Sequence, residues 1–332
     1  MRFRAPRYPF VPSRKACWTW FASLALLLSV RSAWCQPPAS SVSVKELVAV
    51  QAGELPILLS APHGGTLEIP GVPPRAGEGL PRSGAGFSTS RDVGTEELAR
   101  DVAEEIERRF GKKPYLVISR VRRRYLDPNR PPRIAYEDSR AKPVYDRYHD
   151  SLSSFCREAL DRFGGGLLLD LHGQGVRPDA VLRGTKNGLT VKLLRQRYGE
   201  AAHTGPESLF GLLQARGWVV HPHPGDGKEQ TGYDGGYIVQ TYGSQTPFGI
   251  DAMQLEFGRE YRQPKARRQT ARVLVDALLQ YADKYLKLKT AAAKSPSSPL
   301  KVAVYVGPGT GGSRQSLLKY HQGPLRAPAD NP

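Results

Sequence analysis

Residues 55–65 read LPILLSAPHGG, and residues 167–173 read LLLDLHG. Each stretch opens with a short continuous run of apolar residues, which predicts a strand buried on both faces. Each stretch then reaches a histidine held by glycine, His63 in the first and His172 in the second. Ligands of open α/β sheets bind beyond the carboxyl ends of the strands, so we expect the two histidines to converge on one site.

Strands and helices alternate along the rest of the chain. Apolar residues at helical spacing run from Val93 to Phe110, with Thr95 near the start of this helix and Gly111 just beyond its end. Residues 66–90 are rich in glycine and proline without periodicity, which predicts a long surface loop suited to face a substrate. Further helices are expected at 144–163, 206–216 and 265–287, and further strands at 115–119, 218–220, 237–239 and 252–257. The pattern predicts an α/β fold, a single domain with a mixed, mostly parallel sheet flanked by helices.

The formal net charge of +17 is concentrated at the two ends of the chain. Residues 36–289 hold 37 basic and 30 acidic residues, which leaves this body with a modest positive surplus. Such a surplus attracts anionic substrates over a long range without selecting one of them. The sequence has neither interleaved aromatic and basic residues of an RNA-binding motif nor a helix-turn-helix pattern, so no specific nucleic-acid partner is expected.

Residues 1–35 have the order of a secretory signal peptide. A basic region ends at Lys15, an apolar stretch runs from Trp18 to Val30, and a short segment ending at Cys35 follows. The apolar stretch is shorter than the ~20 residues of a membrane-spanning helix, so we expect cleavage and no permanent transmembrane anchor. The predicted location is secreted or periplasmic. A lipid anchor at Cys35 is the alternative, although the bulky Trp34 before it fits a lipidation site poorly.

The segment after Lys289 changes in composition to Ala, Ser, Pro, Gly and Lys. Residues 290–332 are therefore predicted to form a largely disordered tail, and residues 36–289 the catalytic domain. Cys156 is the one cysteine left in the chain once the leader is removed. It lies among apolar residues at helical spacing, which predicts a buried thiol and argues against a nucleophile.

The two histidines suggest a metal site. A catalytic zinc ion takes three protein ligands from His, Asp or Glu and keeps one position open. Asp92, just before a predicted helix, is the expected third ligand beside His63 and His172, and Glu96 and Glu97 compete with it. An acidic residue before a helix can also serve only as a cap or a dipole partner. Asp170, two residues before His172, either orients a ligand imidazole or caps the strand end.

Seven short sequence blocks stand in a fixed order between residues 55 and 262. They are SAPHGG at 60–65, RD at 91–92, DPNRP at 127–131, DLHG at 170–173, GGYI at 235–238, YG at 242–243 and DAMQLE at 251–256. Each block alone is weak evidence, but in their shared order they resemble the N-formylglutamate amidohydrolase family. The resemblance implies a phosphorylase/hydrolase-like α/β fold, distantly related to zinc carboxypeptidases, and zinc-dependent hydrolysis of an amide.

The resemblance implies one Zn²⁺ held by His63, Asp92 and His172. It also implies Glu256 as the catalytic carboxylate, which takes a proton from the zinc-activated water and passes it to the leaving amine. A charged residue at the end of an apolar strand is otherwise unwelcome, although the residues alone leave open an exposed strand-end glutamate.

Asn129 and Arg130 resemble the pair with which zinc carboxypeptidases hold the free carboxylate of a substrate. Arginine suits this task because its planar fork binds a carboxylate through two hydrogen bonds. The alternative for Arg130 is a surface arginine among many, since five other arginines stand between residues 120 and 133. This basic tract would make the mouth of the site positive and favour an acidic substrate.

The predicted function is hydrolysis of a C–N amide bond in a small acidic N-acyl amino acid or peptide. Pro128 departs from the Asp-Leu-Asn-Arg form of the family, and the leader is at odds with cytoplasmic histidine degradation, so formylglutamate itself is not favoured. The nearest alternative is a secreted carboxypeptidase-like or γ-glutamyl peptidase. From another class, the alternative is a non-catalytic basic module that binds an anionic polymer. The HPHP stretch at 221–224 is not expected to bind metal, because its prolines impose an extended loop.

Overall fold

The computed structural model describes residues 42–82 and 86–288. The predicted leader and the predicted tail lie outside these residues. The strands are β1 (Val48–Gln51), β2 (Ile57–Ala61), β3 (Tyr115–Ser119), β4 (Leu167–Gly173), β5 (Ala180–Gly184), β6 (Val219–His221) and β7 (Asp251–Phe257). The helices are α1 (Val44–Leu47), α2 (Thr95–Phe110), α3 (Pro132–Ala135), the 3-10 helix η1 (Ser139–Ala141), α4 (Lys142–Phe163), α5 (Lys192–Tyr198), α6 (Ala201–Thr204), α7 (Leu209–Gln214), α8 (Tyr237–Tyr242), α9 (Arg259–Arg262) and α10 (Pro264–Tyr285).

The seven strands form one mixed sheet in the order β1-β3-β2-β4-β7-β5-β6. The central strands β3, β2, β4 and β7 run parallel to one another. β1 joins β3 in antiparallel orientation, and β5 joins β7 in the same way, while β6 pairs with β5 in parallel. The predicted α/β class with a mixed, mostly parallel sheet is confirmed.

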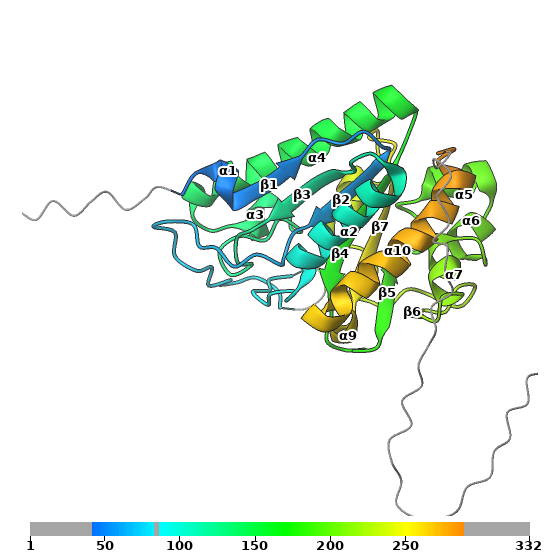
Figure 1. Ribbon diagram of the computed structural model, residues 1–332. Coiled ribbons are helices and arrows are strands. Elements are labelled where there is room, and N and C mark those ends of the chain that lie inside the picture. Colours follow the sequence, from blue (N-terminus) through cyan, green and yellow to red (C-terminus); the bar gives the residue numbers. More distant parts are fainter. Residues whose placement is uncertain (1–41, 83–85, 289–332) are drawn as a thin grey trace, which may run out of the picture. The chain divides into compact units, whose positions relative to one another are not determined.

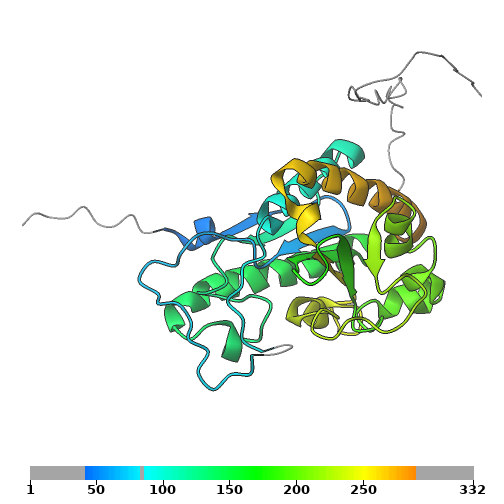
Figure 2. The same ribbon diagram turned by 90° about the horizontal axis from the view of Figure 1, so that it is seen from below.

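Helices cover both faces of this sheet (Figure 1). Alternate side chains of a strand point to opposite faces, so Leu59 of β2 packs in the core under α2 and α10, whereas Leu58 packs under α4. The view from below shows α10 and α4 on opposite sides of the strands (Figure 2). Cys156 of α4 is fully buried in the second core, and burial raises the pKa of its thiol to about 12. The prediction of a buried thiol is confirmed.

Most of the predicted elements are present, with one clear error. α2 ends at Phe110 and is followed by Gly111 in the left-handed conformation (φ 68°), as predicted, although Val93 precedes the helix and is 60% exposed. The strand predicted at 237–239 is wrong, because these residues begin α8. A short apolar run fits one helical turn as well as a strand, and here the preceding Gly236 begins the helix. No helix in the described ranges is long and apolar enough to cross a membrane.

Candidate functional site

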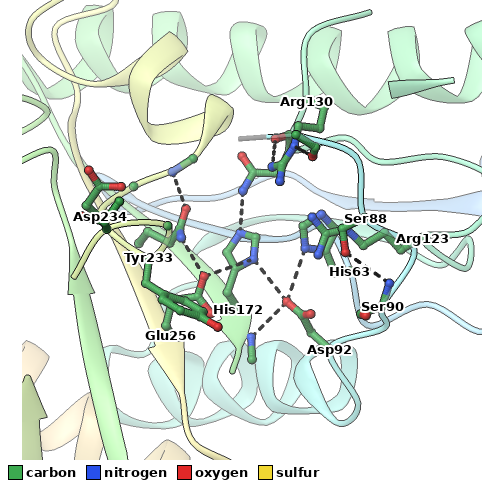
Figure 3. A pocket seen from close by; sticks show the side chains of 18 of the residues that line it. His63, Ser88, Ser90, Asp92, Arg123, Arg130, His172, Tyr233, Asp234 and Glu256 are labelled. Atoms are coloured by element: carbon green, nitrogen blue, oxygen red, sulfur yellow. Dashed lines mark hydrogen bonds and ion pairs between the residues drawn. The ribbon is translucent and has the colours of Figure 1, made fainter. Parts of the chain in front are cut away.

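The carboxyl ends of β2 and β4 bring the two histidines together at one edge of the sheet. His63 stands two residues after the end of β2, and His172 is the second-last residue of β4. Asp92 precedes α2, and its Oδ2 atom lies 3.3 Å from His63 Nδ1 and 3.2 Å from His172 Nδ1. All three side chains are buried, and the ligand atoms that they offer lie within 4.8 Å of one another. Figure 3 shows this carboxylate between the two imidazoles.

This group fits a zinc ion in its ligand types and in the two spacings that Asp92 makes. Two imidazoles and one carboxylate are ligand types of catalytic zinc. Zinc bonds of about 2.0–2.1 Å place neighbouring ligand atoms of a tetrahedron about 3.3 Å apart, which is the spacing of both Asp92 contacts. His63, Asp92 and His172 could therefore hold a metal ion.

Other residues considered as ligands stand apart from this group. The Glu96 carboxylate pairs with Arg100 at 3.0 Å and with Arg120 at 3.5 Å. His221 ends β6, and the exposed His223 pairs with Asp226. Within the residues that the structure describes, neither Glu96 nor this histidine pair belongs to a group suited to a metal.

Each histidine of the group has a second carboxylate at its other ring nitrogen. Asp127 Oδ1 lies 2.7 Å from His63 Nε2, and Asp170 Oδ2 lies 2.9 Å from His172 Nε2. Both carboxylates are fully buried. Carboxylates in this position fix the tautomer and the ring orientation of a metal-binding imidazole. Asp170 thus lies where one of its two predicted roles requires.

The charges of the site make it attractive to a cation. Burial raises the pKa of Asp92, but the neighbouring His63 and His172 outweigh burial and hold this pKa well below its usual range. Burial likewise raises the pKa of Asp127, but Arg123 and His63 outweigh burial and hold this pKa well below its usual range too. Burial lowers the pKa of His172, whereas the adjacent carboxylates hold it well above its usual range. The protein therefore keeps ionised carboxylates in its interior, where a bound cation would offset their repulsion.

Glu256 is placed beside the group by the register of the sheet. β4 and β7 are parallel, and His172 is the direct partner of Glu256, so both side chains leave the same face. Glu256 Oε1 lies 4.0 Å from His172 Nδ1 and accepts a hydrogen bond of 2.8 Å from Gln254 Nε2. The Gly236 N–H donates to Gln254 Oε1 at 2.7 Å, which orients this amide. Burial raises the pKa of Glu256 to about 7, with the charge of His172 opposing the rise.

The sheet face toward α4 changes from apolar to polar along the strands. Every second residue of these strands points to this face. Near the amino ends of the strands such residues belong to the core, and near the carboxyl ends they form the site. The opposite face stays apolar to the strand ends. The core residues of the α4 face are Leu58, Leu168 and Ala252, and the polar residues that continue it are Ser60, Asp170, His172, Gln254 and Glu256.

A cavity of about 680 Å³ is lined by His63, Asp92, His172, Gln254 and Glu256, among others. Part of its wall is formed by Gly86, Phe87, Ser88 and Ser90, so the loop predicted at 66–90 does face the site. Figure 3 shows Tyr233 and Asp234 on the Glu256 side of the group, and Ser88 and Ser90 on the His63 side. The basic side chains of the lining are Arg82, Arg123, Arg130 and Lys186, and the acidic ones are Asp92, Asp234 and Glu256.

Asn129 and Arg130 also line this cavity. Asn129 Oδ1 accepts a hydrogen bond of 2.8 Å from the Ile238 N–H, and Asn129 Nδ2 lies 3.2 Å from His172 Nε2. Arg130 donates from Nε to the Gly86 carbonyl and from Nη1 to the Asn129 carbonyl, at 2.7 and 2.8 Å. Asn129 thus lies between His172 and the start of α8, and the Arg130 guanidinium has a fixed orientation at the wall. All six residues predicted for the site lie in one pocket.

Three residues around this pocket were missed by sequence reasoning. Asp127 stood in the DPNRP block, but nothing in the sequence indicated its contact with His63. Arg123, which donates to Asp127 Oδ2 at 2.8 Å, was one of many arginines. Gln254 could have been found, because it stands two residues before Glu256 on a predicted strand and therefore shares its face.

Comparisons with known proteins give a structural likeness alone. No protein-family model matches the chain, and no curated protein does. Among solved structures the chain is similar to N-formylglutamate amidohydrolase from Ralstonia eutropha JMP134, with 17% identity and a TM-score of 0.48 over 72% of this chain and 97% of that chain. It is also similar to a gene product from Agrobacterium tumefaciens, with 17% identity and a TM-score of 0.46 over 70% of this chain and 94% of that one. Values at this level carry no conclusion about activity, which has to be inferred from the site.

Proposed function

We propose that this protein is a zinc-dependent hydrolase that cleaves a C–N amide bond in a small acidic N-acyl amino acid or peptide. The observation that supports it best is the convergence of a zinc-like ligand group and a buried glutamate in one pocket with basic walls. We assign the catalytic domain to residues 36–289. Export by the leader at residues 1–35 stays a prediction.

His63, Asp92 and His172 hold the metal in this proposal, through the two Nδ1 atoms and one carboxylate oxygen. The Nε2–H group of His63 then donates to Asp127, and that of His172 donates to Asp170, since both pairs lie within hydrogen-bond distance. Zinc bound there would supply Lewis-acid chemistry, activating water as a nucleophile and polarising an amide carbonyl.

Glu256 handles the proton in this proposal. A general base works best when its pKa lies near the working pH, because it must both take up and release the proton. Burial raises the pKa of Glu256 toward neutrality, and the hydrogen bond from Gln254 holds Oε1 in place. Glu256 takes a proton from the attacking water at its Oε2 atom and delivers it to the nitrogen of the leaving amine.

Arg130 binds a carboxylate of the substrate, and its neighbour Asn129 keeps the pocket wall in position. The backbone contacts of Arg130 hold its guanidinium at the cavity. Arg123 and Lys186 stand in the same lining, where they pair with Asp127 and Asp234. An acidic substrate is therefore favoured over a neutral one.

The volume of the cavity favours the peptide among the possible substrates. Pockets of about 300–1,000 Å³ enclose most of a drug-sized ligand, and 680 Å³ lies in the middle of that range. An N-formyl amino acid is much smaller than such a ligand. A peptidase that cleaves a γ-glutamyl or C-terminal peptide bond with the same residues is thus our second candidate.

Metal content and amide hydrolysis test the proposal together. The purified protein and its His172→Ala variant are analysed for bound metal, then assayed on N-formyl, N-acetyl and γ-glutamyl substrates. We expect about one zinc per chain, lost in the variant, and turnover by the wild type only. A wild type that neither binds metal nor cleaves any of these amides after zinc addition would refute the hydrolase and favour a non-catalytic module for an anionic polymer.

A further inference from the structure

Arg262 joins three segments at the edge of the sheet that carries the site. It is the last residue of α9, which directly follows β7. Its Nε donates to the Phe257 carbonyl at 3.0 Å and its Nη2 to the Gln174 carbonyl at 3.1 Å. Its Nη1 donates to the Val93 carbonyl. One planar guanidinium thus uses all three of its nitrogens on backbone oxygens from three different parts of the chain.

Each of these carbonyls stands beside a residue of the proposed catalytic group. Val93 follows Asp92, and Phe257 follows Glu256. Gln174 lies two residues after His172. The intervening Gly173 N–H donates to Asp92 Oδ2 at 3.0 Å, so two of the three segments also touch each other. The positions of Asp92, His172 and Glu256 relative to one another are therefore set around this guanidinium.

Arg262 occupies space that side chains would need at two neighbouring positions, both of which are glycine. A Cβ atom on Gly173 would lie 2.6 Å from Arg262 Cζ, which is closer than any real contact. A Cβ atom on Gly94 would lie 2.5 Å from the Arg262 carbonyl oxygen, and Gly94 has a φ of 88° that favours glycine. The guanidinium is thus packed directly against the strand end that carries His172.

The charge of Arg262 supports its three hydrogen bonds. Burial lowers the pKa of Arg262, and the nearby Asp92 and Glu256 carboxylates oppose this change. Arginine nevertheless remains charged in proteins at neutral pH. A charged donor makes stronger hydrogen bonds to carbonyl oxygens than a neutral one, which strengthens the three contacts of Arg262.

We propose that Arg262 is a positioning residue that sets the spacing of Asp92, His172 and Glu256 and thereby the metal affinity of the site. This inference rests on the proposed metal site. A lysine could replace the charge but not the fork, because its ammonium is a point donor that cannot reach three divergent carbonyls at once.

Zinc titration of the full-length protein against a competing chelator tests the proposal, with thermal unfolding of the metal-free protein measured in parallel. For Arg262→Gln and Arg262→Lys we expect zinc binding to weaken by about 10- to 100-fold, which is the usual effect of losing an orienting partner of a metal ligand. The matched control is Arg216→Gln. Arg216 also donates to two backbone carbonyls, of Leu212 and Asp276, but neither of these residues stands next to a proposed metal ligand or to Glu256.

Gly173→Ala tests the same contact from the other side. The added methyl group displaces the guanidinium without removing it, so the variant should lose zinc affinity in the same way as Arg262→Gln. Equal zinc affinity of wild type, Arg262→Gln and Gly173→Ala would overturn the inference. So would an Arg262→Lys protein with wild-type affinity, since charge alone would then be sufficient.

The outcomes also separate this inference from the proposed function. A wild type that binds no zinc contradicts the metal site itself, whatever Arg262 does. A wild type that binds zinc, with variants that lose only thermal stability of the metal-free protein, contradicts the positioning role alone. Loss of zinc affinity in the Arg262 variants but not in Arg216→Gln supports it.

Discussion

Replacing Asp127 by asparagine changes one charge in the interior while keeping the shape of the side chain. Asp127 is fully buried and accepts from His63 Nε2 at 2.7 Å and from Arg123 Nε at 2.8 Å. An asparagine has one acceptor and one donor end. If its oxygen still faces His63, its amide N–H₂ opposes the Arg123 N–H, and in the other orientation it opposes the His63 N–H.

Two separate effects follow from this loss. Leaving the Arg123 charge buried without a partner lowers the free energy of unfolding by about 3–5 kcal/mol. Weakening the orientation of His63 reduces zinc affinity about 10- to 100-fold, which corresponds to about 1.4–2.8 kcal/mol of binding. The assays are urea unfolding of the metal-free protein and zinc titration against a chelator, with the surface variant Asp138→Asn as the control.

A double variant separates the two effects. Adding Arg123→Met to Asp127→Asn removes the unpaired charge, so stability should return toward that of the wild type while zinc affinity stays low. Full zinc affinity in Asp127→Asn, within a factor of two of the wild type, would refute the orienting role of this carboxylate. Recovery of zinc affinity together with stability in the double variant would also refute it, because the loss would then be a consequence of unfolding.

Three further predictions concern other parts of the molecule. Glu256→Gln should keep its zinc, because Glu256 is not in the ligand group, and should lose about 10²- to 10⁴-fold in kcat; equal metal loss in Glu256→Gln and His63→Ala, measured by elemental analysis, would contradict this division. Arg130→Lys should raise KM for an acidic substrate at least as much as it lowers kcat, since the planar fork is lost; an unchanged KM would show that the carboxylate binds elsewhere. Burial lowers the pKa of His203 to about 4, below about 6.5 in the unfolded chain, so the unfolded state binds the proton more tightly between these values. The free energy of unfolding should therefore fall by up to about 3 kcal/mol as the pH drops from about 6.5 to about 4. Urea titrations of His203→Gln should show a smaller fall over the same pH range. An equal fall in wild type and variant would refute the lowered pKa of His203.

The strands that carry the site were predictable because their sequences are unusual. A strand buried on both faces needs a continuous apolar run, and LPILLS and the LLL that opens LLLDLHG provide one each. His63 and His172 were then expected to meet, since parallel neighbours end at the same edge of a sheet. The structure brings them together with Asp92.

The parts that were missed depend on contacts between distant residues. β5 was not predicted, because its run is broken by Arg183, which becomes compatible with a buried strand only through an ion pair of 3.0 Å with Glu229. Residues 237–239 were expected to form a strand but begin α8, because so short an apolar run does not distinguish the two periodicities. Asp127 pairs with His63 across 64 residues of sequence, a distance at which neither spacing nor composition carries a signal.

The register between β4 and β7 decides more than which residues are neighbours. Side chains alternate along β7, so inserting or deleting one residue at its amino end would put an aliphatic or aromatic side chain in the place of Glu256 and turn the carboxylate into the opposite apolar layer. His63, Asp92 and His172 come from segments outside β7 and would stay in place. Such a misaligned molecule would still capture zinc yet have no group to move the proton, so that a folded, metal-loaded chain can be inert solely through an error of strand alignment.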